Sequence, residues 1–465
     1  MSQRRQPPSP TLLGLPACLV FRATLIVGVI LLFAVSAPAQ PAKAPGLRGV
    51  VLITIDTLRA DHLGSHGGPA ATPHMDRLAR EGADLLHATT PTPSTGPAHA
   101  SLMTGLHPWR HGVLANAVRL SDEFPTLAAL ANAEGIATAA VVSSFVLKKK
   151  FGLKRGFDVY YFPGSEAFTF RGTVRKRFWS RGETTTKLAI KILDGYARDD
   201  FRRFLLWVHY FDPHSPYSPT AEFAVPEDQE VDLTGKSLTD KVTTREALKK
   251  LNRSYRGEVQ YADAQVGQLM AALDRLGLAD STALILTSDH GEGLGDHALI
   301  QHGKNLYSEL VDVPLIVKAP GITSGQRLEG AAQLEDLFPT ILQMLAVPAP
   351  SGGDGLDLLP WLKGEVAASP RLSAVGRRKP YRDLPNLFYS QSRPLKWIGT
   401  IDTPGERFDL KRDPREVFQH KGDGLPASLR MKLDGLSGSR AVPLEESTLD
   451  PETREALEAL GYLPE

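Results

Sequence analysis

The sequence has 465 residues, of which 42% are hydrophobic and 23% charged, so it is long enough for one large domain and a smaller appendage. Lysine and arginine number 53 against 52 for aspartate and glutamate, which gives a formal charge of +1. This balance provides no electrostatic argument for a nucleic acid or an acidic membrane face as a partner. The basic run Lys148–Lys150 is therefore expected to be a solvated turn rather than a binding patch.

The first forty residues differ in composition from the rest of the chain. Charged residues end at Arg22, and an uncharged, mainly apolar run follows from Ala23 to Ala37. This run is shorter than the roughly 18 residues of a membrane span, and Ala37-Pro38-Ala39 has the small-x-small pattern of a cleavage site. We expect residues 1–39 to be a secretory signal and the protein to be secreted or periplasmic, with an uncleaved N-terminal anchor as the alternative. Cys18 is the only cysteine, so the mature chain would hold no disulfide.

Short apolar runs alternate with helical patterns along the chain, which predicts a layered α/β fold. The runs typical of strands covered on both faces are Val50–Ile55, Ala139–Val142, Phe204–Val208, Ala283–Thr287 and Pro314–Lys318. Pro125 suits the first turn of a helix that ends before Gly135. Apolar residues at three- and four-residue steps predict a long helix from about Arg245 to Leu276.

After about Gly364 the sequence becomes charged and is interrupted by prolines. A β-like piece occurs near Leu395–Ile401, and a helical tail is predicted from roughly Pro451 to Leu460. We therefore expect a catalytic domain over residues 40–364 and a small C-terminal subdomain with its tail over residues 365–465.

Two of the predicted strands end in acidic residues. Asp56 follows the first strand, and Asp289 and His290 follow the fourth. Ligands of open α/β sheets bind outside the carboxyl ends of strands, so these three side chains could converge. Two carboxylates and an imidazole suit Zn²⁺ or Mn²⁺ better than Ca²⁺. A lone strand-end aspartate is more often a helix N-cap, but residues 289–292 cluster an acid, an imidazole and flexible backbone.

The segment TPSTGPAHASLMTG at residues 92–105 places a hydroxyl near the start of a helix. If Pro97 begins that helix, Thr95 lies just ahead of its N-terminus, where free N–H groups and the helix dipole favour an anionic phosphoryl or sulfuryl group. Coordination by a metal would make the hydroxyl nucleophilic. On this segment alone, a helix N-cap is the more common role for such a threonine.

From about Val50 to about Glu416 the chain resembles the sulfatase family. The resemblance is carried, in order, by ITIDTLRADHLG, TPSTGPAHASLMTG, VHYFDPHSPY, TSDHGEGLGDH, VPLIVKAPG, LEDLFPTIL and FDLKRDPRE, and the tail LDPETREALEALGYL is also characteristic. It implies an alkaline-phosphatase-like fold, with a large mixed β-sheet sandwiched by helices and a small C-terminal antiparallel sheet. It also implies a metal held by Asp56, Asp289 and His290, with Thr95 as a further ligand.

The chain also departs from the family pattern. Sulfatases proper have Cys or Ser at the place of Thr95 and convert it to formylglycine, which threonine cannot become. His99 stands where arginine is usual and is a candidate substrate-binding residue, and Ser143 and Phe145 stand where sulfate-binding Lys and His normally lie. These departures favour the threonine-nucleophile phosphodiesterases of the nucleotide-pyrophosphatase type. Asn116 lies 116 − 95 = 21 residues after Thr95, similar to the substrate-binding Asn of those enzymes and of phosphonate monoester hydrolases, with a turn residue as the alternative.

The same relatives carry a second metal on an Asp and two His. The candidates here are Asp212, His214 and His302. In single-metal sulfatases the His214 position contacts substrate and a lysine replaces His302, a role that Lys304 could cover. His209 is expected to be structural. The resemblance thus implies one or two divalent ions, with two favoured because an imidazole takes the place of the lysine at His302. Zn or Mn is favoured, Ca and Mg are alternatives, and no formylglycine is expected.

We therefore expect a secreted metal-dependent hydrolase that cleaves phosphate or sulfate esters through Thr95, with phosphodiesters or phosphonate esters favoured. Small-molecule, glycan or lipid esters are the expected substrates, no nucleic acid is expected to bind, and membrane contact would come only from an uncleaved N-terminus. The alternatives are a sulfuric ester hydrolase of the arylsulfatase type, a phosphoryl transferase and a catalytically silent binding domain. Transferases of this fold carry membrane helices for which this sequence has no candidates, and the set of Asp56, Thr95, Asp289 and His290 argues against a silent domain.

Overall fold

The computed structural model describes residues 47–164, 167–170, 173–176, 178–199, 203–224, 244–378, 386–434, 449–460 and 462. The predicted signal at residues 1–39 lies outside these residues. Residues from Pro45 to Glu465 form one compact unit. Among the described residues, no helix has the length and apolar character that a membrane span requires.

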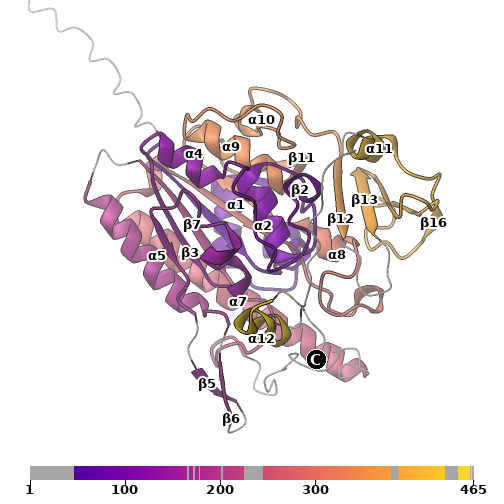
Figure 1. Ribbon diagram of the computed structural model, residues 1–465, viewed down its shortest axis with the longest axis horizontal. Coiled ribbons are helices and arrows are strands. Elements are labelled where there is room, and N and C mark those ends of the chain that lie inside the picture. Colours follow the sequence, from indigo (N-terminus) through magenta and orange to yellow (C-terminus); the bar gives the residue numbers. More distant parts are fainter. Residues whose placement is uncertain are drawn as a thin grey trace, which may run out of the picture. The chain divides into compact units, whose positions relative to one another are not determined.

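A mixed sheet forms the centre of this unit (Figure 1), in the strand order β11-β2-β10-β8-β1-β7-β3-β4 with β9 beside β2. Its strands are β1 (Gly49–Ile55), β2 (Ala83–Thr89), β3 (Ala137–Val142), β4 (Val159–Tyr161), β7 (Phe204–Tyr210), β8 (Thr282–Ser288), β9 (Asp312–Val313), β10 (Leu315–Lys318) and β11 (Gln326–Gln333). β1 pairs in parallel with β7 and β8, whereas β10 is antiparallel to β8 and β2. The expected large mixed sheet is confirmed, and all five predicted strands occur with small differences at their ends.

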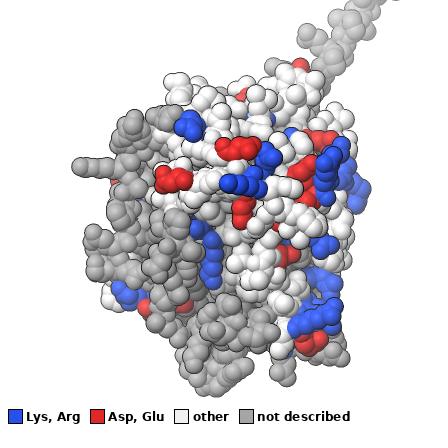
Figure 2. Space-filling model, turned by 90° about the vertical axis from the view of Figure 1, so that its right-hand side faces the viewer, with Lys and Arg blue, Asp and Glu red and all other residues white. Residues whose placement is uncertain are grey.

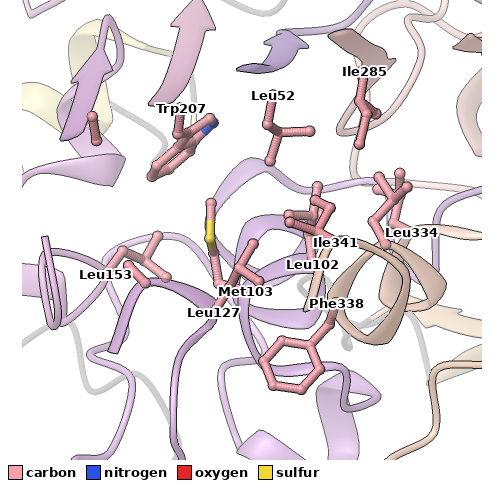
Figure 3. Packing of buried hydrophobic residues seen from close by; sticks show 14 of the residues in the cluster. Leu52, Leu102, Met103, Leu127, Leu153, Trp207, Ile285, Leu334, Phe338 and Ile341 are labelled. Atoms are coloured by element: carbon pink, nitrogen blue, oxygen red, sulfur yellow. The ribbon is translucent and has the colours of Figure 1, made fainter. Parts of the chain in front are cut away.

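Helices cover both faces of this sheet, and alternate residues of β1 explain why. Val50 and Leu52 belong to one buried apolar cluster, and Val51 and Ile53 to another, because successive side chains of a strand point to opposite faces. On one face lie α1 (Pro73–Glu81), α5 (Gly182–Ala197) and α7 (Arg245–Arg275), and on the other α2 (Thr95–Thr104), α4 (Leu127–Ala133) and α9 (Leu337–Met344). Figure 3 shows Leu52 above Leu102 of α2 in the second of these layers.

The remaining elements are short. Further helices are α3 (Pro108–His111), α8 (Ser308–Val311), α10 (Leu359–Leu362), α11 (Ala427–Asp434) and α12 (Pro451–Ala459). The 3-10 turns are Ala60–His62, Gly64–His66, Phe145–Leu147, Lys149–Phe151, Ala279–Ser281, Asp296–Ala298 and Leu334–Asp336. A separate hairpin pairs β5 (Ala167–Phe170) with β6 (Thr173–Lys176).

A small antiparallel sheet follows the large one in the chain, as expected. Its strands, in spatial order, are β12 (Ala374–Arg378), β13 (Leu387–Ser392), β14 (Leu395–Gly399), β15 (Glu406–Asp409) and β16 (His420–Lys421). The β-like piece predicted near Leu395–Ile401 is β14, and the predicted helical tail is α12.

Two local predictions are wrong. The helix predicted to contain Pro125 begins only at Leu127, because Thr126 is its N-cap and accepts a hydrogen bond from the N–H of Ala129 at 3.2 Å. The run Lys148–Lys150 is not simply a solvated turn. Its first and third lysines are half-buried and form ion pairs with carboxylates at the start of α12.

Candidate active site

The predicted metal ligands lie together because three strands end side by side. β1 lies between β7 and β8, with Ile55 opposite Tyr210 on one side and Ser288 on the other. Asp56 therefore leaves the sheet at the same edge as Asp289 and His290. All three side chains are almost completely buried. Their ligand atoms lie within 4.8 Å of one another, close enough to hold one metal ion.

The two carboxylates have too few partners for their burial. Neither oxygen of Asp56 has a hydrogen-bond partner among the described residues, and nor does Oδ2 of Asp289. Oδ1 of Asp289 accepts from the N–H groups of Thr57 and His290 at 3.2 and 2.9 Å. Burial, reinforced by the charge of Asp289, raises the pKa of Asp56 well above its ordinary value, and burial raises that of Asp289 to about 6. Since buried carboxylates need compensation, a divalent cation fits this pocket.

The imidazole of His290 completes that donor set. Its Nδ1–H donates to the carbonyl of Gly291 at 2.9 Å, so the neutral ring carries a lone pair on Nε2. Nε2 lies 3.5 Å from Asp289 Oδ2 and 3.9 Å from Asp56 Oδ1. Burial lowers the pKa of His290 well below its ordinary value, which keeps the ring neutral. An imidazole fixed through its other nitrogen is typical of metal-ligating histidines.

The hydroxyl of Thr95 faces this group. Its Oγ lies 3.3 Å from Nε2 of His290, and the residue is fully buried. The structure differs from the expected placement ahead of a helix: Thr95 is the first residue of α2, and Ser94, with extended backbone, is the N-cap. The role of N-cap that a threonine at this place commonly has is therefore excluded for Thr95.

His99 lies beneath the nucleophile candidate, where both of its ring nitrogens have hydrogen-bond partners. Nδ1 donates to the carbonyl of Thr95 at 2.8 Å, and Nε2 accepts from the hydroxyl of Thr54 at 3.1 Å. Thr54 in turn accepts from the indole N–H of Trp207. His99 is fully buried, and these bonds tie the first turn of α2 to β1. Its contact with a substrate stays a prediction.

His209 belongs to a second group, with His99 and Asp289, whose spacing would also suit a metal. Nδ1 of His209 accepts from the N–H of Ser143 at 3.3 Å, so its Nε2 bears a proton and lies 3.7 Å from Asp56 Oδ2. Since the nitrogens of His99 are also engaged, neither imidazole offers a free lone pair. This group is therefore less suited to an ion than the group of Asp56, Asp289 and His290.

Asn116 contacts the residue that follows Thr95. Its Oδ1 accepts from the N–H of Gly96 at 2.7 Å, so its amide nitrogen points away from that N–H. That nitrogen forms no hydrogen bond with the described part of the chain. A Cβ on Gly96 would lie 3.1 Å from Asn116 Oδ1, so the glycine permits this close approach.

The residues predicted to hold a second metal are only partly together. The rings of His214 and His302 lie 5.1 Å apart, but Asp212 forms an ion pair with Arg181 at 2.6 Å and accepts from the N–H of Gly182. Within the described residues, Asp212, His214 and His302 do not form a metal-binding group. Burial, followed by the charge of Lys304, lowers the pKa of His302 to about 3. The charge of Lys304 is therefore felt at His302.

Two residues of the site were not predicted from the sequence. Glu292 accepts from Nδ1 of His302 at 3.2 Å and from the hydroxyl of Tyr217 at 2.9 Å; its place in the acid-rich run 289–292 was a usable signal. The hydroxyl of Tyr462 lies 3.3 Å from Thr95 Oγ, across 367 residues of sequence. The family-like tail LDPETREALEALGYL contains this tyrosine and was a usable signal, but it did not indicate what the tail contacts.

Comparison with known proteins identifies the family of the chain. The chain is 26% identical to an ulvan-active sulfatase from Formosa agariphila over 458 residues, covering 92% of this chain and 87% of that protein. It is 26% identical to the multifunctional alkaline phosphatase superfamily protein PehA from Trinickia caryophylli over 486 residues, covering 82% of this chain and 93% of that protein. The phosphonate monoester hydrolase of Agrobacterium radiobacter shares the fold, with a TM-score of 0.66 at 21% identity over 84% of this chain and 96% of that one. Residues 48–347 match the family described as Sulfatase, so the chain belongs to the sulfatase family of hydrolases.

Proposed function

We propose that the chain is a metal-dependent ester hydrolase with Thr95 as its nucleophile, acting on a phosphate, phosphonate or sulfate ester. One observation carries this proposal. The hydroxyl of Thr95 lies 3.3 Å from Nε2 of His290, beside buried carboxylate oxygens of Asp56 and Asp289 that have no hydrogen-bond partner within the described residues. A hydroxyl in such a group is suited to nucleophilic catalysis.

In the proposed reaction, Oγ of Thr95 attacks phosphorus or sulfur in line while the bond to the leaving-group oxygen breaks. The hydroxyl proton ends on that oxygen, and the leaving group departs as an alcohol or phenol. The product is a threonyl ester, which water then hydrolyses. The amide nitrogen of Asn116 and the N-terminus of α2 stabilise the negative charge on the transferring group. A divalent cation held by Asp56, Asp289 and His290 would lower the pKa of the attacking hydroxyl.

We favour a single ion, Zn or Mn, with Ca or Mg as alternatives. Two carboxylates and one imidazole form a donor set of this preference. The pairing of Asp212 with Arg181 removes the only carboxylate predicted for a second ion.

Phosphodiesters or phosphonate esters are the favoured substrates, because Thr95 cannot become formylglycine. The positions of the sulfate-binding Lys and His support this choice: Ser143 donates to the carbonyl of His209, and Phe145 is buried in the apolar core, so neither supplies a cation. Sulfate esters are the second candidate, favoured by relatives that are named sulfatases. We further propose that residues 1–39 direct the enzyme to secretion.

The proposal is tested by turnover of aryl sulfate, phosphate monoester, phosphate diester and phosphonate esters by the metal-loaded protein. Thr95→Ala is expected to lower turnover of the preferred ester by at least about a hundredfold, because the nucleophile is lost, while metal content stays near that of the wild type. Thr104→Ala is the matched control, since it removes a hydroxyl at the other end of α2 that bonds only to the carbonyl of Ala100. Thr95→Ala activity above about a hundredth of the wild-type rate, or a purified protein that binds no divalent metal, would refute the proposal.

A further inference from the structure

The C-terminal tail is attached to the catalytic part of the chain by an ionic contact. Lys148 pairs with Glu452 at 2.8 Å, and Lys150 pairs with Asp450 at 3.2 Å and donates to the hydroxyl of Thr453 at 2.6 Å. Asp450 is also the N-cap of α12. The two lysines therefore bind the first turn of the tail helix.

The apolar face of α12 continues this attachment into the core. Ala456, Leu457 and Leu460 are at most 4% exposed and belong to the same buried cluster as Leu102 of the nucleophile helix. The N–H of Tyr462 donates to the carbonyl of Leu457 at 2.7 Å, which is the six-residue bond of a Schellman helix end. Tyr462 is thus held in a fixed relation to a helix that is itself part of the core.

The hydroxyl of Tyr462 reaches the reacting atoms. It lies 3.3 Å from Thr95 Oγ and 3.1 Å from His214 Nε2. Nδ1 of His214 donates to the carbonyl of Ser215 at 2.7 Å, so Nε2 of the neutral ring is an acceptor and the phenol is the donor in that pair.

We infer that Tyr462 is a substrate-contacting residue, whose hydroxyl turns from Nε2 of His214 to donate its hydrogen bond to a non-bridging oxygen of the tetrahedral group bound at Thr95. This inference rests on the proposed function, because it takes Thr95 as the place where the phosphoryl, phosphonyl or sulfuryl group binds. The phenol oxygen lies within hydrogen-bond distance of Thr95 Oγ. A non-bridging oxygen of an anion bound at Thr95 has to lie in the same region of the site. A neutral donor fixed there by the fold stabilises charge that develops during transfer.

The test compares Tyr462→Phe with wild type in the full-length, metal-loaded protein. We expect binding of inorganic phosphate, measured by calorimetry, and inhibition by orthovanadate to weaken at least about tenfold. For the preferred ester, kcat/KM should fall by about tenfold to a hundredfold, as for the loss of one oxyanion donor, with unchanged metal content and Tm. Tyr160→Phe is the matched control, because it removes a phenol that bonds to the carbonyl of Leu147 outside the site.

A chain ending at Leu460 is the second variant, and it should lose at least as much activity as Tyr462→Phe. Unchanged or tighter phosphate binding in Tyr462→Phe, or higher turnover by either variant, would overturn the inference and show that the phenol merely occludes the site. Failure of the proposed function has a different outcome. In that case no ester is turned over by wild type, but the difference in phosphate binding between wild type and Tyr462→Phe still reports on the phenol.

Discussion

The reactivity proposed for Thr95 depends on the residues that fix its position. Its carbonyl accepts from His99, and the N–H of the next residue, Gly96, donates to Asn116. The first turn of α2 is therefore held from two sides, and Oγ faces His290. A misplacement of about 1 Å in such a group can lower a rate by about a hundredfold. We accordingly treat His99 as a positioning residue for Thr95.

Asn116 has two candidate roles, a substrate contact and a structural role in the turn, which substitutions can distinguish. If its amide nitrogen contacts the substrate, Asn116→Asp is expected to be less active than Asn116→Ala, because a carboxylate repels the anion, although it can still accept from Gly96. If Asn116 only orders the turn, Asn116→Asp should stay active, whereas Asn116→Ala should lose about 1–3 kcal/mol of stability with the buried hydrogen bond. We expect the first order of activities, with kcat/KM for Asn116→Asp lowered at least about a hundredfold. Steady-state kinetics and Tm of both variants provide the measurement.

At the scale of an element, α12 follows the small sheet in sequence but packs in the core of the large one. Burial of each of its leucines, Leu457 and Leu460, contributes about 1.5–3 kcal/mol. The partly exposed ion pairs of Lys148 and Lys150 contribute about 0–1 kcal/mol each. The apolar face thus supplies most of the attachment, and the lysines set its register.

Lys150→Met is expected to loosen α12 without unfolding the protein. The apolar stem would still pack near Phe145, but the contacts with Asp450 and Thr453 are lost. Hydrogen exchange across residues 450–460 should accelerate by roughly twofold to tenfold, consistent with loss of partly exposed ion pairs. Lys149→Met is the control, because Lys149 is exposed and its substitution removes the same charge from the same turn. Equal exchange in the two variants would show that the ion pairs do not hold the tail.

At the scale of the whole molecule, charges of both signs are mixed on one face (Figure 2), whereas two carboxylates lie close together inside. The face in Figure 2 shows lysines and arginines interspersed with aspartates and glutamates, in keeping with the formal charge of +1. Inside, Asp56 and Asp289 share a buried pocket in which three of their four oxygens lack hydrogen-bond partners within the described residues. The stability of the whole unit should therefore depend on whether a cation or protons neutralise these carboxylates.

Chelation of the metal is expected to lower Tm, and by more at about pH 7.5 than at about pH 5.5. The pKa of Asp289 is raised to about 6 in the folded protein, against ~3.9 for an exposed aspartate, and that of Asp56 is raised in the same direction. Between these values the metal-free folded state binds more protons than the unfolded state, so its stability falls as pH rises through the window. A bound cation removes this penalty and adds its own binding free energy.

Thermal unfolding of chelated and metal-loaded protein at both pH values measures this effect. Asp289→Asn is the control and should show little increase of Tm on addition of metal. A metal-dependent increase that is as large at about pH 5.5 as at about pH 7.5 would contradict the linkage between protons and cation.

The sequence by itself determined the elements that depend on local pattern. Continuous apolar runs predicted the buried strands, three- and four-residue spacing predicted α7, and acidic strand ends indicated a ligand-binding edge. The start of α4 at Leu127 was misplaced, since Pro125, two residues earlier, carries an equally plausible start signal.

Only the tertiary structure decided which distant segments meet. Three contacts join residues that no local periodicity relates. They are the ion pair of Asp212 with Arg181, the ion pairs of Lys148 and Lys150 with α12, and the contact of Tyr462 with Thr95. Such contacts arise from the packing of whole elements against a shared core. For this reason the sequence indicated Thr95 and the three side chains proposed to hold a metal, whereas the contact of Tyr462 with Thr95 became evident only from the fold.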